Sequence, residues 1–362
     1  MPFDQGTIAL TIFKLPESLP ENYLEAFNAN SAGKVDDTKD EPMYGWTSAR
    51  YLLETKICEE NSLPGGFPHM SLRTSQRKIP TTLLNAICRR DEIAYMNANE
   101  TDYVPNREKK DIKENVIEQN LMKMPPSISG FPFVIDTTTD YLYLGATSAP
   151  QTDIFIALFV KTVGIEPKPV NPASIMIEEY QQDINNLQKI NFIEGNNNDS
   201  EIGWDFLTWL WYFCEDGGKV DLDNLGEFSA FVDGPLTFIL DGDEQGAVET
   251  VIKKGNPTNS AEAKASLQAG KKLKKAKLTI TRGEDIWSCS FDAQTFTFSG
   301  LKLPDGEKMH REEKFIERME NLHIFHQAIR GYFKQFAETL KAKDWNSVEK
   351  RIQNWVSEKK AF

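Results

Sequence analysis

Strand-like and helix-like patterns of apolar residues alternate through the first half of the chain. Apolar and polar residues alternate over Thr7–Leu15, which predicts an opening strand. Apolar residues three and four positions apart predict helices over Pro80–Ala98 and Arg107–Met122, the first with its proline in the opening turn. Two shorter helices and three further strands, the last two forming a hairpin, are predicted at Pro20–Ala32, Pro150–Val163, His69–Ile79, Phe131–Asp136 and Tyr141–Ala146.

Prolines mark two irregular segments between these elements. Pro125 and Pro126 separate the second long helix from the hairpin, and they predict a stiff loop that projects from the body. Gly164–Pro172 contains three prolines and is therefore the best candidate for a linker.

The second half continues with a strongly apolar helix and a group of strands. The helix is expected at Gly203–Phe213, and a short helix at Asn259–Ala269 has Ser260 or Asn259 as its N-cap. Strands are predicted at Pro235–Leu240, Leu273–Thr281, Ile286–Phe291 and Thr295–Leu301.

The C-terminus is helical. Apolar residues recur every three or four positions from Phe315 to Leu340, which gives a face suited to a core or a partner helix, and Asp344–Val356 follows as a last helix. The fold class is therefore α+β, with antiparallel β-meanders covered by helices, an elongated multi-lobed protomer and a helical C-terminus. We expect three regions, residues 1–165, 166–305 and 306–362.

Charge is distributed unevenly. The chain has 362 residues and a net charge of −13, which by itself disfavours a nucleic-acid partner. However, Glu178–Glu244 holds 16 acidic and two basic residues, a net charge of −14, so the remainder carries +1. Local positive patches outside this segment remain possible, and local potential steers a polyanion more than total charge does.

Two groups of basic residues are candidates for contacts with DNA. In the first, Lys109 and Lys113 share a helix face, where like charges repel unless a polyanion binds. The alternative is a solvated helix face, because acidic residues interleave with the lysines. The first group comprises Arg73, Arg77, Lys78, Arg107, Lys109, Lys110, Lys113 and Lys123.

The second group enters a predicted strand and comprises Lys271, Lys272, Lys274 and Lys275. Strict alternation would put Lys272 and Lys274 on one face and Lys271 and Lys275 on the other. Such lysines would touch phosphates as point charges without reading sequence. Protection of a sheet edge by lysine is the alternative.

Catalytic and metal-binding patterns are weak throughout. Asp241–Gly246 begins like a calcium loop but has Gln245 at its fifth position and Ile252 where a glutamate belongs. His323 and His326 lie three apart beside an apolar stripe, which favours packing over metal binding. We predict no catalytic residue, metal or cofactor, although scattered acids could still assemble a two-metal nuclease site.

Several short motifs resemble those of one known family. The segment from Lys113-Glu114-Asn115-Val116 to Ile135-Asp136-Thr137 is similar to the central block of the RdgC recombination-associated proteins, in which a Lys-rich helix leads through a loop to a strand ending Ile-Asp-Thr. Other similar motifs follow the order of that family, namely Gly45-Trp46, Lys78-Ile79-Pro80, Ala269-Gly270-Lys271 and Arg311-Glu312. This chain departs from the family in having Pro125 where the family's loop carries an aromatic residue.

The resemblance implies a ring-shaped homodimer that binds duplex DNA without sequence preference and modulates the RecA recombinase by occupying DNA. By position, Lys109, Lys110, Lys113 and Lys123 fall in the family's basic helix and loop, and Lys271 falls in its Ala-Gly-Lys motif. The expected location is cytoplasmic and nucleoid-associated, without a membrane span. The alternatives are a metal-dependent exonuclease and an acidic protein-interaction module.

Overall fold

A single antiparallel sheet runs through most of the molecule. The computed structural model describes residues 2–182, 187–190, 192, 201–240, 248–306, 310–342 and 344–357. The strands of the N-terminal half are β1 (Ile8–Lys14), β2 (Met43–Ser48), β3 (His69–Gln76), β4 (Ser127–Asp136), β5 (Tyr141–Leu144) and β6 (Lys168–Pro169). Those of the C-terminal half are β7 (Lys219–Leu222), β8 (Gly226–Ile239), β9 (Glu249–Ile252), β10 (Lys272–Arg282), β11 (Asp285–Asp292) and β12 (Thr297–Lys302).

The first strand joins the two halves of this sheet. The strand order is β2-β3-β4-β5-β1-β12-β11-β10-β8-β7, with β6 beside β1 and β9 beside β8. Thr11 of β1 is paired with Leu144 of β5, whereas Leu10 is paired with Phe298 of β12. The predicted α+β class with antiparallel strands and a helical C-terminus is thereby confirmed.

Alternate residues of β1 enter two different hydrophobic cores. Ile8, Leu10 and Ile12 belong to one core, and Phe13 and Leu15 belong to the other. Successive side chains of a strand point to opposite faces, so the two cores lie on opposite faces of the sheet at this point. Helices α1 (Tyr23–Ala29) and α5 (Ala149–Val163) supply the second core, whereas α7 (Ile202–Glu215) and α9 (Arg311–Leu340) supply the first.

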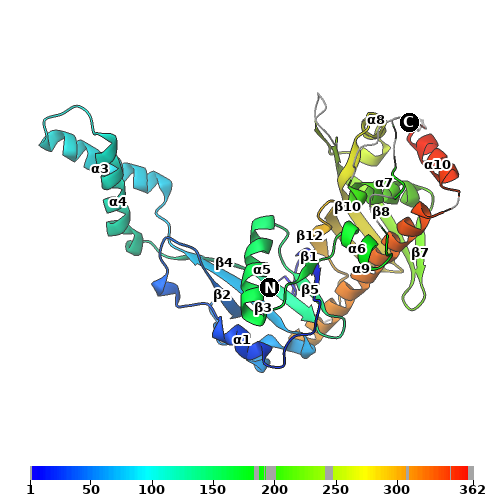
Figure 1. Ribbon diagram of the computed structural model, residues 1–362, viewed down its shortest axis with the longest axis horizontal. Helices are drawn as coiled ribbons and strands as arrows, with labels where there is room; N and C mark the ends of the chain where they lie inside the picture. Colours follow the sequence, from blue (N-terminus) through cyan, green and yellow to red (C-terminus); the bar gives the residue numbers. More distant parts are fainter. Residues whose placement is uncertain are drawn as a thin grey trace.

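Two helices project from one end of the body as an arm (Figure 1). They are α3 (Thr81–Ala98) and α4 (Asn106–Asn120), which confirms both helix predictions. Helix α3 has no buried residue, and Val116 is the buried residue of α4. The arm therefore lies outside both cores, and its two helices contact mainly each other.

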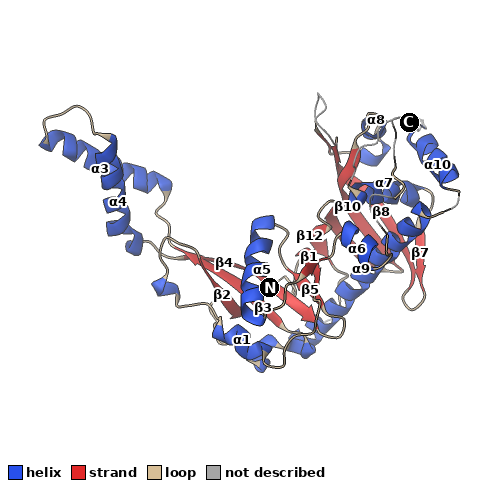
Figure 2. Cartoon of the chain, in the orientation of Figure 1, coloured by secondary structure: helices blue, strands red, loops and turns tan. Residues whose placement is uncertain are grey.

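The prediction of a projecting loop at Pro125 and Pro126 was wrong. Strand β4 begins at Ser127, directly after these prolines, and Ser127 pairs with Gln76 of β3. The pattern of apolar residues does not indicate this part of β4, because Ser127–Gly130 is exposed and held by backbone pairing. The projection is the hairpin of α3 and α4 instead (Figure 2).

Two other predictions are corrected by pairing in the sheet. The segment Gly164–Pro172 is not a free linker, because β6 pairs with β1 and Asn171 caps helix α6 (Pro172–Glu178). Strand β8 begins at Gly226 and not at Pro235, which lies within the strand where its register with β10 shifts. A proline in a strand pattern reads as a strand end, although it is accommodated where pairing is irregular.

The last four described helices follow the predictions closely, whereas α2 (Glu59–Ser62) and α6 were not predicted. Ser260 caps α8 (Ala261–Gln268) by accepting a hydrogen bond of 3.2 Å from the Ala263 amide. Helix α10 (Trp345–Ser357) packs its apolar face inward, with Trp345 and Ile352 buried. The apolar stripe of α9 is also buried in the protomer's own core, since Phe325 and Ile329 are at most 1% exposed.

A buried histidine sits where α9 crosses the centre of the sheet. His326 is 1% exposed, and its Nδ1 lies 3.3 Å from the Tyr143 hydroxyl. Burial, with the nearby Arg330 charge, lowers the pKa of His326 from 6.5 to about 3. The folded state thus holds this imidazole neutral, whereas the unfolded chain binds a proton below pH 6.5.

Acidification should therefore destabilise the protein through His326. Its pKa is depressed on folding, so its contribution is complete above about pH 6.5 and is lost progressively toward pH 3. Between pH 7 and pH 5 the loss should be about 2 kcal/mol. We expect His326→Leu to reduce the pH-dependent fall in unfolding free energy by this amount in urea titrations. Leu322→Met, a buried substitution on the same helix without a titrating group, should leave the fall unchanged; an equal fall in the His326 variant would contradict the interpretation.

Candidate nucleic-acid interface

The arm presents two lysines without ion-pair partners in the described part of the chain. Lys109 and Lys113 are exposed on α4 and four residues apart, so they share a helix face. Their neighbour Lys110 lies 3.6 Å from Glu114 in an exposed ion pair, and Lys123 donates to the Asn120 side chain at 3.2 Å. The first two lysines thus keep their charge available for a partner.

The arm as a whole is not basic. Residues 81–123 contain seven basic and eight acidic side chains. Positive potential can therefore come only from the local placement of charge, as at Lys109 and Lys113. Arg107 and Lys78 are also exposed, the latter between β3 and α3.

Two arginines of the predicted set lie inside the protein. Arg73 is 2% exposed and donates to the carbonyl oxygens of Leu52 and Gly33. Arg77 is 7% exposed and donates from Nε to the Thr38 carbonyl at 2.8 Å and from Nη1 to the Met124 carbonyl. Both guanidinium groups tie loops to β3 or its C-terminal end, so neither is accessible to a nucleic acid.

A match to a known family covers the region that contains this arm. Residues 9–181 match the family model described as "RdgC: Putative exonuclease, RdgC". Over these residues the chain belongs to the RdgC family. The match extends from β1 to α6 and so includes the arm, whereas β10 and the C-terminal helices lie beyond it. No curated protein matches the chain.

The second lysine group lies beyond the matched residues and is only partly accessible. Lys272 is 4% exposed and forms an ion pair of 2.8 Å with the buried Asp205 of α7. The predicted alternation fails here, because pairing with β8 shifts register after Leu273 and two successive residues, Lys272 and Leu273, are buried. Lys272 therefore has a structural role and is also left out of the proposed interface.

The other lysines of β10 lie nearer the surface. Lys271 donates to the Thr250 hydroxyl at 2.5 Å, and Lys274 is partly exposed. Lys275 is 47% exposed and pairs with Asp292 at 2.8 Å. Figure 1 places β10 and the arm at opposite ends of the curved body, so one protomer does not bring the two lysine groups together.

The acidic segment lies away from the arm. Its described part includes α7, β7 and β8, which Figure 1 shows in the half opposite to α3 and α4. One of its acids, Asp205, is buried with Lys272. Six of its acidic residues lie outside the described residues, namely Asp183, Glu194, Asp199, Asp241, Asp243 and Glu244.

Among the residues that the structure describes, no group of three or more His, Cys, Asp or Glu side chains is arranged to hold a metal ion. The calcium-like segment at residues 241–246 lies outside that part. His326 packs in the core as expected, and the tryptophans of α7 are buried as well. The described helices include none that is long and apolar enough to cross a membrane.

The adjacent residues Arg77 and Lys78 provide a matched test of buried and exposed charge. Arg77→Ala leaves carbonyl oxygens without donors at the base of the arm and should cost about 2–4 kcal/mol of unfolding free energy. Lys78→Ala, one residue away and exposed, should change it by less than about 0.5 kcal/mol. Denaturant titrations of both variants measure the difference. Equal effects would show that the hydrogen bonds of Arg77 to these carbonyl groups do not stabilise the fold.

Proposed function

We propose that this protein binds double-stranded DNA without sequence preference as a ring-shaped homodimer. The observation that carries the proposal is the family match over residues 9–181, which includes an arm with exposed, unpaired Lys109 and Lys113. By occupying duplex DNA, the dimer would limit the access of a RecA-type recombinase. Binding of this kind would make the protein cytoplasmic and nucleoid-associated.

The mechanism is electrostatic. Lysine side chains would replace counterions condensed on the phosphates, and the released ions drive association. An ammonium group acts as a point charge and does not read base edges, so sequence preference should be absent. The proposed contacts are the accessible members of the predicted set: Lys78, Arg107, Lys109, Lys110, Lys113, Lys123, Lys271, Lys274 and Lys275.

Dimer contacts are proposed at the arm end. The C-terminal helices are unsuited, because the apolar stripes of α9 and α10 are already buried within the protomer. By contrast, Leu83 and Ile93 of α3 are 40% and 43% exposed, and Met122 and Ile128 near the arm base are 55% and 37% exposed. A two-fold axis at this end would set two curved protomers face to face, and a second contact at the opposite end would close a ring.

A nuclease remains the alternative function, since the family description names an exonuclease. Incubation of linear duplex with Mg²⁺ or Mn²⁺ separates the two proposals. Shortening of the DNA that disappears on substitution of clustered acidic residues would favour the enzyme. An acidic interaction module would ignore duplex and bind a basic protein.

Duplex affinity should fall steeply with salt. Each phosphate contact contributes about 0.9 to the slope of log affinity against log salt concentration. Lys109→Glu combined with Lys113→Glu should weaken binding and reduce the slope by about 1 for each lysine. Fluorescence anisotropy of a labelled duplex between about 50 mM and 200 mM salt measures both quantities.

The matched control for this experiment is Lys350→Glu combined with Arg351→Glu. These residues are exposed on α10, at the end away from the arm, and the change in net charge is the same. The control should bind with nearly the original slope. Equal weakening by both double variants would attribute the effect to net charge, and absence of duplex binding at about 50 mM salt would refute the proposal.

A further inference from the structure

A cavity lies where the N-terminal segment, the β2–β3 connection and the start of α9 meet. Its volume is about 500 Å³, within the usual range for small-molecule sites. Arg318 of α9 fixes one wall by donating to the carbonyl oxygens of Pro2 and Phe3 at 3.0 and 2.9 Å, beside Asp4. The cavity is thus formed by segments that are far apart in sequence and held together by the fold.

Another wall comes from α2 (Glu59–Ser62) and the 3₁₀ turn Pro64–Gly66, which lie between β2 and β3. The Gly65 amide donates to the Glu312 carboxylate at 3.1 Å, and this contact anchors the connection to the first turn of α9. A Cβ at Gly65 would lie 2.5 Å from the Ile316 side chain, and the residue has φ of +57°. Glycine is therefore needed for this close approach.

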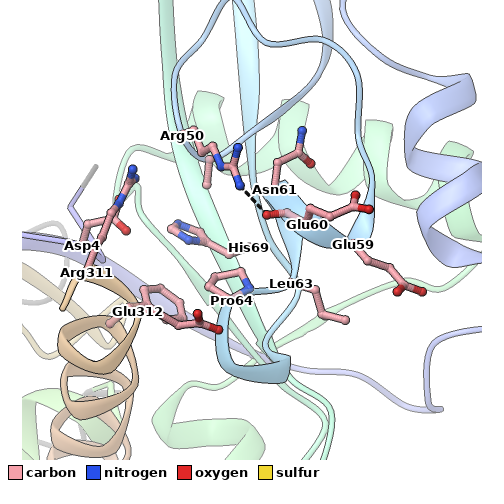
Figure 3. Close-up of a pocket in the computed structure, with 12 residues that line it drawn as sticks. Asp4, Arg50, Glu59, Glu60, Asn61, Leu63, Pro64, His69, Arg311 and Glu312 are labelled. Atoms are coloured by element: carbon pink, nitrogen blue, oxygen red, sulfur yellow. Dashed lines mark hydrogen bonds and ion pairs between the residues drawn. The ribbon is translucent and has the colours of Figure 1, made fainter.

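Two arginines face this cavity from different walls. Arg50 comes from the loop after β2 and donates to the Glu60 carbonyl, and Arg311 opens α9. Figure 3 shows them on either side of the space, with the imidazole of His69 between and behind them. Arg311 is 67% exposed and lies 3.7 Å from Asp4, so its guanidinium keeps donors available.

His69 forms the floor of the cavity and has an unused hydrogen-bonding atom. It is 2% exposed, and its ring stacks on Phe315 with centroids 4.9 Å apart. Its Nε2 has no hydrogen-bond partner among the residues that the structure describes. Burial lowers the pKa of His69 to about 4. A buried polar atom without a partner lowers the stability of the fold unless a ligand or water forms a hydrogen bond with it.

Four carboxylates also line the cavity, but they are engaged or exposed. Glu312 accepts from the Gly65 amide, and Asp4 faces Arg311. Glu60 is hydrogen-bonded to the Cys58 thiol, and Figure 3 shows the carboxylates of Glu59 and Glu60 pointing away from His69. The donors that remain around His69 are therefore mainly guanidinium N–H groups, which match phosphate oxygens.

We propose that this cavity binds a phosphomonoester, with Arg50 and Arg311 clamping the phosphate and His69 completing its hydrogen bonds. The ligand is either a free 5′-mononucleotide or the 5′-phosphate at a DNA end, since both present the same group. The site is separate from the arm and does not depend on ring formation or on duplex binding through Lys109 and Lys113.

Calorimetric titration of the full-length protein with 5′-dAMP, inorganic phosphate and deoxyadenosine tests the site. The phosphate-bearing ligands should bind and deoxyadenosine should not. Arg50→Ala and Arg311→Ala should each weaken binding about tenfold or more, as expected for loss of a charge-assisted hydrogen bond. Arg351→Ala, an exposed arginine on α10, is the matched control and should bind like the unmodified protein.

His69→Phe distinguishes a ligand-binding role from a structural one. The phenyl ring keeps the stack on Phe315 but removes the nitrogens, so binding should weaken while thermal stability is retained. If the His69→Phe protein does not fold, Arg311→Ala still tests the site, because the Arg311 side chain is mostly exposed.

Two duplexes that differ only in 5′-phosphate or 5′-hydroxyl ends identify the source of the phosphate. A preference for phosphorylated ends that is lost in Arg311→Ala supports the site and assigns its ligand to a DNA end. Binding of 5′-dAMP without an end preference supports it and assigns a free nucleotide. The proposal is overturned if neither ligand binds up to about 10 mM and no end preference exists, or if binding survives both arginine substitutions.

Discussion

The pairing of Ile8–Lys14 with a strand from each half of the chain is the interaction on which the rest of the molecule depends. Strand β1 hydrogen-bonds to β5 on one side and to β12 on the other, so two strand groups become one sheet. Its side chains also enter both cores, which lie on opposite faces. Figure 1 shows β1 near the middle of the curved body, with the arm and β10 at opposite ends.

Burial divides the basic residues into two functional kinds. Arg73, Arg77 and Lys272 are enclosed and hold carbonyl groups or a carboxylate, because a charged group removed from water needs such partners. Lys109 and Lys113 remain on the surface, where a charge stays available to a polyanion. Both kinds look alike in a sequence, since a cluster of lysine and arginine does not reveal which side chains point inward.

Strong periodic patterns predicted most of the fold. The helices of the arm, the long α9 and the strands β10–β12 were confirmed because each has a sustained apolar period. The polar start of β4 and the short β6 were missed because backbone pairing, not side-chain burial, holds them in the sheet. Their residues carry no pattern that a sequence could display.

The two candidate sites also differ in whether the sequence predicts them. The arm lysines were found in advance, since they lie on one helix face at fixed spacing. The cavity around His69 was not, because Arg50 and Arg311 are far apart in sequence and meet only through the fold. A buried histidine beside a phenylalanine has no sequence signal distinct from ordinary core packing.

Retention on closed circular DNA tests the central claim most directly. Protein loaded on a covalently closed duplex and on the same duplex after linearisation is challenged with high salt, and the bound fraction is measured. A ring that encircles DNA loses its electrostatic contacts but cannot leave a closed circle, so the protein should remain on the circle and dissociate from the linear form. Equal loss from both forms would contradict the ring.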